Sequence, residues 1–354
     1  MKELLSRFQL QDEPVSCERF GHGHINETYL VTCEKGKRYI LQKINKGIFT
    51  QPEQLMENIA ATTAYIEAHS DDPRAAMHLV LTKDSKACYK AADGEYWRVY
   101  DFVPGTICLQ KAESPKDFYH CGLIFGRFQG QLADFPAETL HEPITDFHNT
   151  RVRFAQLHAA MERNFENRLK TCQKELEFAL SREREAGAIV DKLASGALPL
   201  RVTHNDTKLN NILFDKKTRT PVCVIDLDTI MPGSSLYDYG DAIRFGASTA
   251  AEDEQDLNKV WCDMELLRTY TEGFLEGCDG SLTELEVEML PMGAKLMTLE
   301  CGIRFLADYL NGDTYFRTHY ADQNLVRART QLKLVADMEE KWQKMHKIVK
   351  ECVK

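Results

Sequence analysis

The sequence predicts an α+β fold with two lobes, a small antiparallel sheet followed by a larger and mainly helical part. Residues 1–105 contain short β-rich runs separated by turns and one helical segment, whereas the rest of the chain shows mainly helical periodicity. The length of 354 residues, 43% of them hydrophobic, also suggests two domains or lobes. We therefore expect an N-terminal lobe over 1–105 and a C-terminal lobe over 106–354.

The N-terminal lobe is expected to contain an antiparallel hairpin, one helix and two further strands. The helix is predicted because Leu55, Ile59 and Ile66 lie on one face of a segment rich in helix formers. The strands are predicted from β-branched and aromatic runs that are separated by turn residues. The expected elements in chain order are a strand over 28–32, a turn over 34–37, a strand over 38–44, a helix over 52–68, and strands near 79–81 and 96–100.

The C-terminal lobe is predicted to be helical from about residue 117. Hydrophobic residues recur there at intervals of three and four, as the buried face of a helix requires. We interpret this stripe as core, the charged run 181–185 as a solvated helix face, and residues 330–354 as helical. The stripe consists of Leu157, Met161, Phe165, Leu169, Cys172 and Leu176.

A glycine-containing turn lies between the first two β-rich runs. Gly21 and Gly23 leave room for backbone N–H groups to approach phosphate oxygens, although most turns of this kind are only tight hairpins. Lys43 follows one strand later, where kinases keep a lysine on the nucleotide phosphates. Its carboxylate partner on the following helix is Glu53 or Glu57, and the sequence does not choose between them. We expect Gly21, Gly23 and Lys43 to bind the nucleotide, together with Asp101 and Val103 of the connector 101–105.

The densest polar motif of the chain runs from His204 to Asp226. Asp206 and Asn211 have the spacing of H-x-D-x-x-x-x-N, and Asp226 follows after two short apolar runs that predict a hairpin. Asp206 is placed to accept a hydroxyl proton, and Asn211 and Asp226 are placed to hold Mg²⁺ on the phosphates of ATP. Two roles are open for Asp228, a metal contact or a brace of the loop.

The composition of the chain limits the classes of molecule that we expect it to bind. The formal net charge of −10 argues against nucleic acid or an anionic membrane as the main partner. The N-terminus lacks the apolar core of an export signal, and no run is long enough to span a bilayer. The eleven cysteines form no Cys-x-x-Cys pair, so we expect reduced thiols in a cytoplasmic protein and no structural zinc.

The motif departs from that of protein kinases. Asn205 stands where they have arginine, Asp226-Leu227-Asp228 replaces Asp-Phe-Gly, and no Ala-Pro-Glu follows, so a peptide substrate is not expected. The chain instead resembles the aminoglycoside phosphotransferase and choline kinase superfamily, and within it the N-acetylhexosamine 1-kinases, over nearly its whole length. The segments that carry the resemblance are 21–26, 201–213, 225–248 and 301–309.

The resemblance implies a protein-kinase-like fold and an ATP- and Mg²⁺-dependent transfer to the anomeric hydroxyl of a small-molecule sugar, GlcNAc or GalNAc. Asp206 matches the catalytic base, and Asn211 and Asp226 match the magnesium-binding positions. His24, Arg304 and Tyr315 match positions that contact the sugar, as Asp206 also does. The resemblance does not distinguish the two sugars, and it leaves the oligomeric state open.

Three alternatives remain. The first is a kinase of the same fold for another alcohol, such as another sugar, an aminoglycoside, choline or homoserine. The second is a metal-dependent hydrolase using Asp206, Asp226, Asp228 and Asp241, although such sites usually include several histidines and only His204 is near. The third is an inactive nucleotide-binding protein. Asp238 and Asp241 are interpreted as structural residues that bond the catalytic loop.

Overall fold

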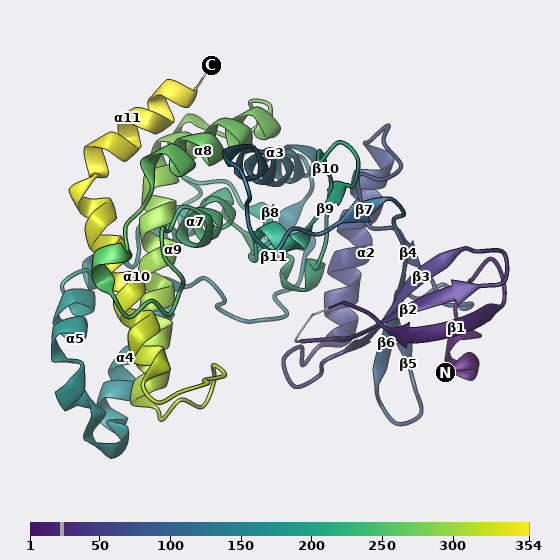
Figure 1. Ribbon diagram of the computed structural model, residues 1–354, viewed down its shortest axis with the longest axis horizontal. Coiled ribbons are helices and arrows are strands. Elements are labelled where there is room, and N and C mark those ends of the chain that lie inside the picture. Colours follow the sequence, from purple (N-terminus) through teal and green to yellow (C-terminus); the bar gives the residue numbers. More distant parts are fainter. Residues whose placement is uncertain (22–24, 354) are drawn as a thin grey trace. The chain divides into compact units, whose positions relative to one another are not determined.

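The computed structural model describes residues 1–21 and 25–353, which form two compact units. Unit 1 contains Met1–Leu109, Asp134–Thr145 and Asn211–Pro232, and unit 2 contains the remaining segments from Gln110 onward. Unit 1 carries the strands of the main sheet, and unit 2 carries most of the helices (Figure 1).

The main sheet of unit 1 has the strand order β1-β2-β3-β6-β4, with β5 paired to β6. All of these pairings are antiparallel. The predicted strands and the predicted helix over 52–68 are confirmed, and β1 is the β-rich run that precedes the glycine-containing turn. The elements are α1 (Lys2–Leu5), β1 (Pro14–Arg19), β2 (Glu27–Cys33), β3 (Arg38–Ile44), α2 (Pro52–Ala68), β4 (Leu79–Val80), β5 (Tyr89–Lys90) and β6 (Tyr96–Asp101).

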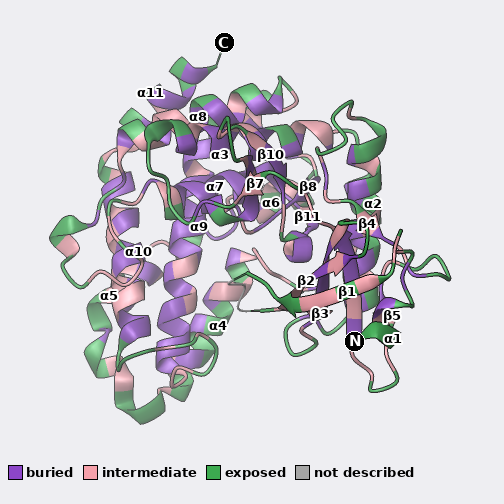
Figure 2. Cartoon of the chain, turned by 45° about the vertical axis from the view of Figure 1, so that its right-hand side comes forward, coloured by how far each residue is buried: buried purple, intermediate pink, exposed green. Residues whose placement is uncertain are grey.

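The two faces of this sheet have different neighbours. Val31, Leu41 and Val99 are fully buried on one face and pack with Leu5 and Phe8 near the N-terminus; we call this the α1 face. Alternate residues point to the opposite face, because successive side chains of a strand alternate. That opposite face, which we call the α2 face, contacts helix α2. Figure 2 shows β1 in the colours of intermediate and exposed residues, and buried residues alternate with partly exposed ones along parts of β2 and β3.

A second, three-stranded sheet in unit 1 contains the predicted hairpin. Strand β9 (Ile212–Asp215) pairs antiparallel with β10 (Pro221–Val224) and with β7 (Thr106–Ile107). The hairpin is confirmed, and Asn211 lies just before β9 while Asp226 lies two residues after β10. The backbone N–H of Ile225 donates to the carbonyl of Asn211 at 2.9 Å.

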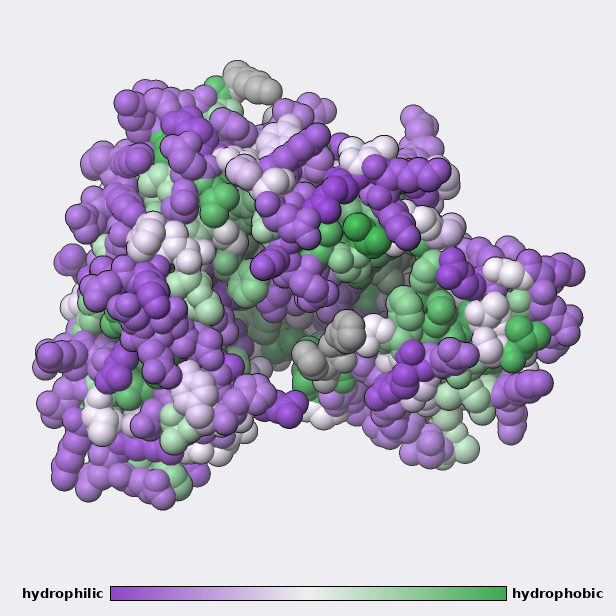
Figure 3. Space-filling view, viewed as in Figure 1, coloured by the Kyte–Doolittle hydropathy of each residue, from purple (hydrophilic) through white to green (hydrophobic). Residues whose placement is uncertain are grey.

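Unit 2 is built around long helices. Helix α3 packs closely along α8 because glycines line the contact: a Cβ on Gly122 would lie 2.3 Å from the carbonyl oxygen of Tyr270. Hydrophilic residues cover most of the visible outer surface of these helices (Figure 3). The elements include α3 (Pro115–Gln131), α4 (Thr150–Arg163), α5 (Gln173–Leu180), α6 (Val190–Ala194), β8 (Arg201–Thr203), α7 (Ser235–Gly246), α8 (Met264–Cys278), α9 (Glu284–Leu310), α10 (Gln323–Glu340) and α11 (Trp342–Cys352), and strand β11 (Met231–Gly233) crosses the boundary between the units.

The predicted stripe over 157–176 was wrong as a single helix face. Helix α4 ends at Asn164, which has a left-handed backbone with φ of 41°, and a 3-10 segment follows before α5 begins. Leu157 and Leu176 are buried as predicted, but Phe165 is exposed. Asparagine tolerates positive φ better than most residues, so the chain turns there although the hydrophobic spacing continues. The predicted helical character of 330–354 is confirmed by α10 and α11.

Within the described residues, no helix combines the length and the apolar character needed to cross a bilayer.

A buried ion pair joins β8 to the start of α9. The Arg201 guanidinium donates to both carboxylate oxygens of Glu286, at 2.5 and 2.7 Å, and Ser235 donates to the same carboxylate at 2.8 Å. Burial raises the pKa of Glu286, but the bonds from Arg201, Thr283 and Ser235 lower it more, so its pKa lies below the ordinary value of 4.5. The ionised form of Glu286 therefore stabilises the fold above pH 4.5, and this stability is lost as the pH falls through the lowered pKa.

We predict that Glu286→Gln lowers the free energy of unfolding by about 3–5 kcal/mol near neutral pH, because Arg201 is left buried without a counter-charge. Urea unfolding at a series of pH values checks this. The variant is expected to lose less stability than the wild type as the pH falls below 4.5. Glu351→Gln, which breaks an exposed pair with Arg268, is the control and should change stability little. Equal stability of the Glu286→Gln variant and the wild type at pH 7 would contradict the prediction.

Candidate active site

The loop after β8 is held in place by a buried carboxylate. Asp238 of α7 accepts hydrogen bonds from the backbone N–H of His204 at 3.0 Å and of Asn205 at 2.8 Å, and from the Gln129 amide at 2.8 Å. Burial raises the pKa of Asp238, and these donors oppose the shift. Asn205 has a positive φ of 64°, so the bonds to Asp238 hold the loop in a backbone conformation that it would otherwise seldom adopt.

A second carboxylate of α7 fixes the next part of the loop. Asp241 accepts the backbone N–H of Thr207 at 3.2 Å and is paired with Arg244 at 2.8 Å. Burial raises the pKa of Asp241, but Arg244 and Lys208 lower it more, so it lies below the ordinary range. The prediction that Asp238 and Asp241 bond the catalytic loop is confirmed.

Asp206 projects from this loop with its side chain 29% exposed. The ammonium of Lys208 lies 2.6 Å from its Oδ1. Burial lowers the pKa of Lys208, but Asp206 and Asp241 raise it more, which keeps the ammonium charged. A partly exposed carboxylate beside a fixed cation can accept a hydrogen bond from a hydroxyl group and later take its proton. Lys208 was not among the predicted site residues, although it lies only two positions after Asp206.

The two predicted metal ligands lie together in unit 1. Asn211 precedes β9 and Asp226 follows β10, and the bond from Ile225 to Asn211 brings these two strand ends together. Among the described residues, no group of three or more His, Cys, Asp or Glu side chains is placed to hold a metal by itself. One amide and one carboxylate nevertheless fit Mg²⁺, which takes its remaining ligands from phosphates and water.

Asp228 braces the loop after the metal position. Its buried carboxylate accepts hydrogen bonds from Arg98 of β6 and from the side-chain amide of Asn26. The Asn26 side-chain oxygen in turn accepts the backbone N–H of Asn45 at 2.9 Å. Of the two roles open for Asp228, the structure shows the brace. Arg98 was missed by the sequence reasoning, since no motif marks it.

The carboxylate partner of Lys43 was predicted wrongly. Its ammonium lies 3.0 Å from Glu95 and 3.9 Å from Glu27, and not beside a glutamate of α2. Glu53 instead accepts the Tyr96 hydroxyl, and Glu57 pairs with His141. The physical reason is strand register: Lys43 lies opposite Glu27 of β2 and Trp97 of β6, on the α1 face of the sheet, whereas α2 packs on the other face.

The remaining predicted nucleotide contacts lie at or just beyond the ends of strands of the main sheet. Asp101 ends β6 and is paired with Lys37 at 2.8 Å, and the carbonyl of Val103 accepts the Thr106 hydroxyl at 2.8 Å. Gly21 has a φ of 75°, which glycine tolerates readily. Gly23 and His24 lie outside the described residues. Nucleotide binding by these positions stays a prediction.

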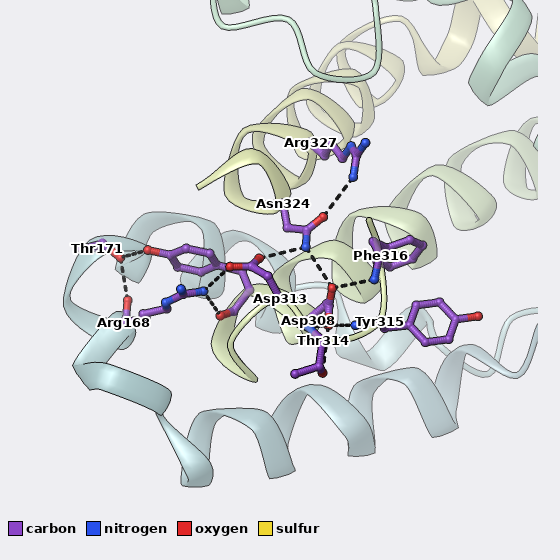
Figure 4. A network of polar contacts seen from close by, with 10 residues as sticks. Arg168, Thr171, Asp308, Asp313, Thr314, Tyr315, Phe316, Asn324 and Arg327 are labelled. Atoms are coloured by element: carbon purple, nitrogen blue, oxygen red, sulfur yellow. Dashed lines mark hydrogen bonds and ion pairs between the residues drawn. The ribbon is translucent and has the colours of Figure 1, made fainter. Parts of the chain in front are cut away.

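Two of the predicted sugar-binding residues lie together in unit 2. The guanidinium carbon of Arg304 on α9 lies 6.0 Å from the ring centre of Tyr315, and 5.5 and 5.6 Å from those of Phe316 and Phe147. The Tyr315 side chain is 71% exposed and points away from the polar network that fixes its backbone (Figure 4). An arginine among aromatic rings offers hydrogen-bond donors and apolar faces, which together suit a sugar.

The backbone around Tyr315 is fixed by Asp308 of α9. Its carboxylate accepts the backbone N–H of Thr314, Tyr315 and Phe316 at 3.0, 2.9 and 2.9 Å (Figure 4). The side-chain amide of Asn324 joins the same carboxylate to that of Asp313, and Arg168 pairs with Asp313 at 2.6 Å. An exposed tyrosine on a tightly bonded loop is typical of a ligand contact held ready before binding.

His148 is a further candidate that the sequence did not indicate. Its Nδ1 lies 2.8 Å from the Glu300 carboxylate, which also accepts the Thr150 hydroxyl at 2.7 Å. Its Nε2 is buried without a hydrogen-bond partner in the described part of the chain. The ring lies beside those of Phe147 and Tyr237, and Phe147 also contacts Arg304. A single histidine before a helix carries no sequence signal for this.

Comparison with known proteins agrees with this geometry. A family model described as APH, phosphotransferase enzyme family, matches residues 16–270, well over half of the chain. Among solved structures, the chain is similar to a microcompartment-associated aminopropanol kinase, with 18% identity, a TM-score of 0.58 and 98% and 97% of the two chains covered.

Two further kinases show the same likeness. The amicoumacin kinase hAmiN, solved with AMP-PNP, Ca²⁺ and Ami, has 15% identity, a TM-score of 0.60 and 96% of each chain covered. Choline kinase LicA from Streptococcus pneumoniae has 14% identity, a TM-score of 0.53 and 95% and 97% covered. These likenesses confirm the predicted two-lobed α+β kinase-like fold.

Proposed function

The chain belongs to the APH phosphotransferase enzyme family, and we propose that it transfers the γ-phosphoryl group of ATP to the anomeric hydroxyl of an N-acetylhexosamine. The observation that carries the proposal is the Arg304 group of unit 2, where a guanidinium lies among the rings of Phe147, Tyr315 and Phe316. The same unit carries Asp206 on its carboxylate-bonded loop.

The charge near Arg304 favours a neutral acceptor. Arg153 lies close enough that the Arg304 charge helps lower its pKa, after burial, which is the larger cause. Choline, aminoglycosides and amino alcohols are cations at neutral pH and are repelled by the two arginines, although the carboxylates of Glu300 and Asp146 offset part of that positive charge. A sugar with an acetamide group instead offers carbonyl and hydroxyl oxygens to these donors. The alternative of a same-fold kinase for a cationic alcohol is therefore less well supported than a sugar kinase.

Each residue has a defined task in the proposed reaction. Asp206 accepts a hydrogen bond from the sugar hydroxyl, orients its oxygen toward the γ-phosphorus and takes the proton late, because the transition state is loose. Lys208 holds the Asp206 carboxylate in position and stabilises its charge. Asn211 and Asp226 would hold Mg²⁺, which supplies positive charge to the phosphate oxygens when bound. Water is a competing acceptor, so we expect slow hydrolysis of ATP when no sugar is present.

We predict that incubation with Mg²⁺, ATP and GlcNAc or GalNAc gives the sugar 1-phosphate. Proton and phosphorus NMR check this, since the anomeric proton of the product couples to phosphorus as well as to H2. Glucose, choline and an aminoglycoside complete the panel, and choline and the aminoglycoside should give no product. Phosphate on another carbon, or product only from a cationic alcohol, would contradict the acceptor assignment while leaving the phosphotransferase family intact.

A matched pair of variants tests the Arg304 group in the same assay. Arg304→Met is expected to raise the KM for the sugar by about 10- to 100-fold, as expected when hydrogen bonds from a charged donor are lost. The KM for ATP should stay unchanged. Arg317→Met removes an exposed arginine from the same segment and should leave both constants near the wild-type values. Equal sugar KM in both variants would exclude Arg304 as an acceptor contact.

A further inference from the structure

Two cations of unit 1 lie on opposite faces of the main sheet. In the register of β3 and β6, Lys43 lies opposite Trp97, whereas Gln42 lies opposite Arg98. Because side chains alternate along a strand, Lys43 belongs to the α1 face and Arg98 to the α2 face. The Lys43 side chain is 30% exposed and forms an ion pair with Glu95, whereas the Arg98 side chain is 1% exposed. The two positively charged groups therefore lie in different surroundings, one partly exposed and one buried.

Arg98 lies between a strand and a helix that correspond in chain order to the elements from which protein kinases supply a lysine and its glutamate partner. Its Nε donates to Oε1 of Gln42 on β3 at 2.9 Å, and its Nη1 contacts the sulfur of Met56 on α2 at 3.7 Å. Gln42 and Met56 are both uncharged, so neither β3 nor α2 supplies an ionic group at this point. The cation comes from the neighbouring strand β6 instead.

Arg98 is close to two segments that are predicted to bind the nucleotide phosphates, the segment with Asp226 and the one that follows the glycine-containing turn. Its Nη1 is paired with Asp228, two residues after the predicted metal ligand Asp226. Asp228 also holds Asn26, which follows the glycine-containing turn in the chain. Burial lowers the pKa of Arg98, but Asp228 and, more weakly, Asp226 raise it above its ordinary value, so the guanidinium stays charged. All of these residues belong to unit 1.

The hydrogen bonds of Arg98 leave part of its donor capacity unused. A guanidinium has five N–H groups. In the described part of the chain, Nε and Nη1 of Arg98 make the bonds given above, and Nη2 donates none. A guanidinium that is held through Nε and Nη1 and still carries the two N–H groups of Nη2 offers charged donors that suit a phosphate oxygen.

We infer that Arg98 of β6, and not Lys43 of β3, is the protein cation that contacts the polyphosphate of the nucleotide. Its pair with Asp228 fixes the guanidinium and ties it to the segment that carries Asp226. The inference concerns the nucleotide and does not depend on which alcohol accepts the phosphoryl group. A purely structural role, in which Arg98 only neutralises Asp228, makes a different prediction about variants that remove both charges.

The test compares ADP with adenosine as probes, using titration calorimetry in EDTA so that no metal contributes. The main variant is Arg98→Met combined with Asp228→Asn, which removes the buried charges together and avoids leaving either one unpaired. We expect it to fold, to bind ADP about 10- to 100-fold more weakly than the wild type, and to bind adenosine with unchanged affinity. Asp228→Asn alone keeps the Arg98 cation, so its affinity for ADP should be closer to that of the wild type than the affinity of the double variant is.

Lys43→Met gives the direct comparison, with Lys46→Met as its control because both lysines pair with Glu95. Neither is expected to change ADP affinity more than about twofold, since exposed pairs contribute little. Arg98→Lys keeps a charge without the planar fork and should fall between the wild type and the double variant. Wild-type ADP affinity in the double variant, or a large loss of ADP affinity in Lys43→Met with none in Lys46→Met, would overturn the inference.

Discussion

Replacing Asp206 with asparagine is expected to lower kcat by roughly 10²–10⁴-fold, the usual contribution of a general base. Asparagine fills the same space and still accepts a hydrogen bond, but it cannot take the hydroxyl proton. The Lys208 ammonium lies 2.6 Å from the wild-type carboxylate and would lose this counter-charge. Its remaining electrostatic attraction would then be to Asp241. The measurement is the initial rate of ADP formation at saturating ATP and sugar.

Binding measurements separate a chemical defect in the Asp206→Asn variant from a structural one. The loop is bonded by Asp238 and Asp241, which the substitution does not touch, so the affinity for ADP should equal that of the wild type. Asp215→Asn is the control, since Asp215 accepts hydrogen bonds from its own turn at the end of β9 and otherwise forms only a 3.6 Å ion pair with Arg74 among the described residues. Near-normal kcat in Asp206→Asn would remove Asp206 from its assigned role.

Local patterns were sufficient for most of the elements that position the site. The helix over 52–68 and the strands on either side of Gly36 were predictable, because each depends on neighbours within a few residues and on a turn residue with φ of 84°. The break at Asn164 was not predictable from spacing. Hydrophobic residues continue at helical intervals beyond it, but the left-handed conformations of Asn164, Glu166 and Asn167 end the helix there.

The same distinction applies to the site. Asp206, Asn211 and Asp226 were predictable because loop and hairpin place them within a short stretch of chain. The partner of Lys43 and the role of Arg98 were not, because they depend on which face of the sheet each residue occupies. Arg98 and Asp228 are 130 positions apart, and His148 and Glu300 are 152 apart. Such contacts are formed by packing, and no sequence motif marks either partner.

Substitution of Asp226 is expected to abolish Mg²⁺-dependent turnover. A carboxylate is the only charged ligand that the pair Asn211 and Asp226 offers, and its loss leaves the metal to an amide, phosphates and water. Asp226 also has a left-handed backbone with φ of 60°, so the choice of variant matters. Alanine would add a conformational cost of about 1–2 kcal/mol, whereas asparagine tolerates this conformation and removes the charge.

The two Asp226 variants together therefore separate the metal role from backbone strain. If Asp226 holds the metal, Asp226→Asn and Asp226→Ala both lose turnover at ordinary Mg²⁺, although only the alanine variant is also less stable to urea. If the residue matters only for its conformation, Asp226→Asn stays active and Asp226→Ala does not. Asp84→Ala changes an exposed turn residue of the same unit and should leave rate and Mg²⁺ dependence unchanged. Activity of Asp226→Asn at ordinary Mg²⁺ would show that the metal is held elsewhere, because this variant removes the negative charge and one of the two carboxylate oxygens.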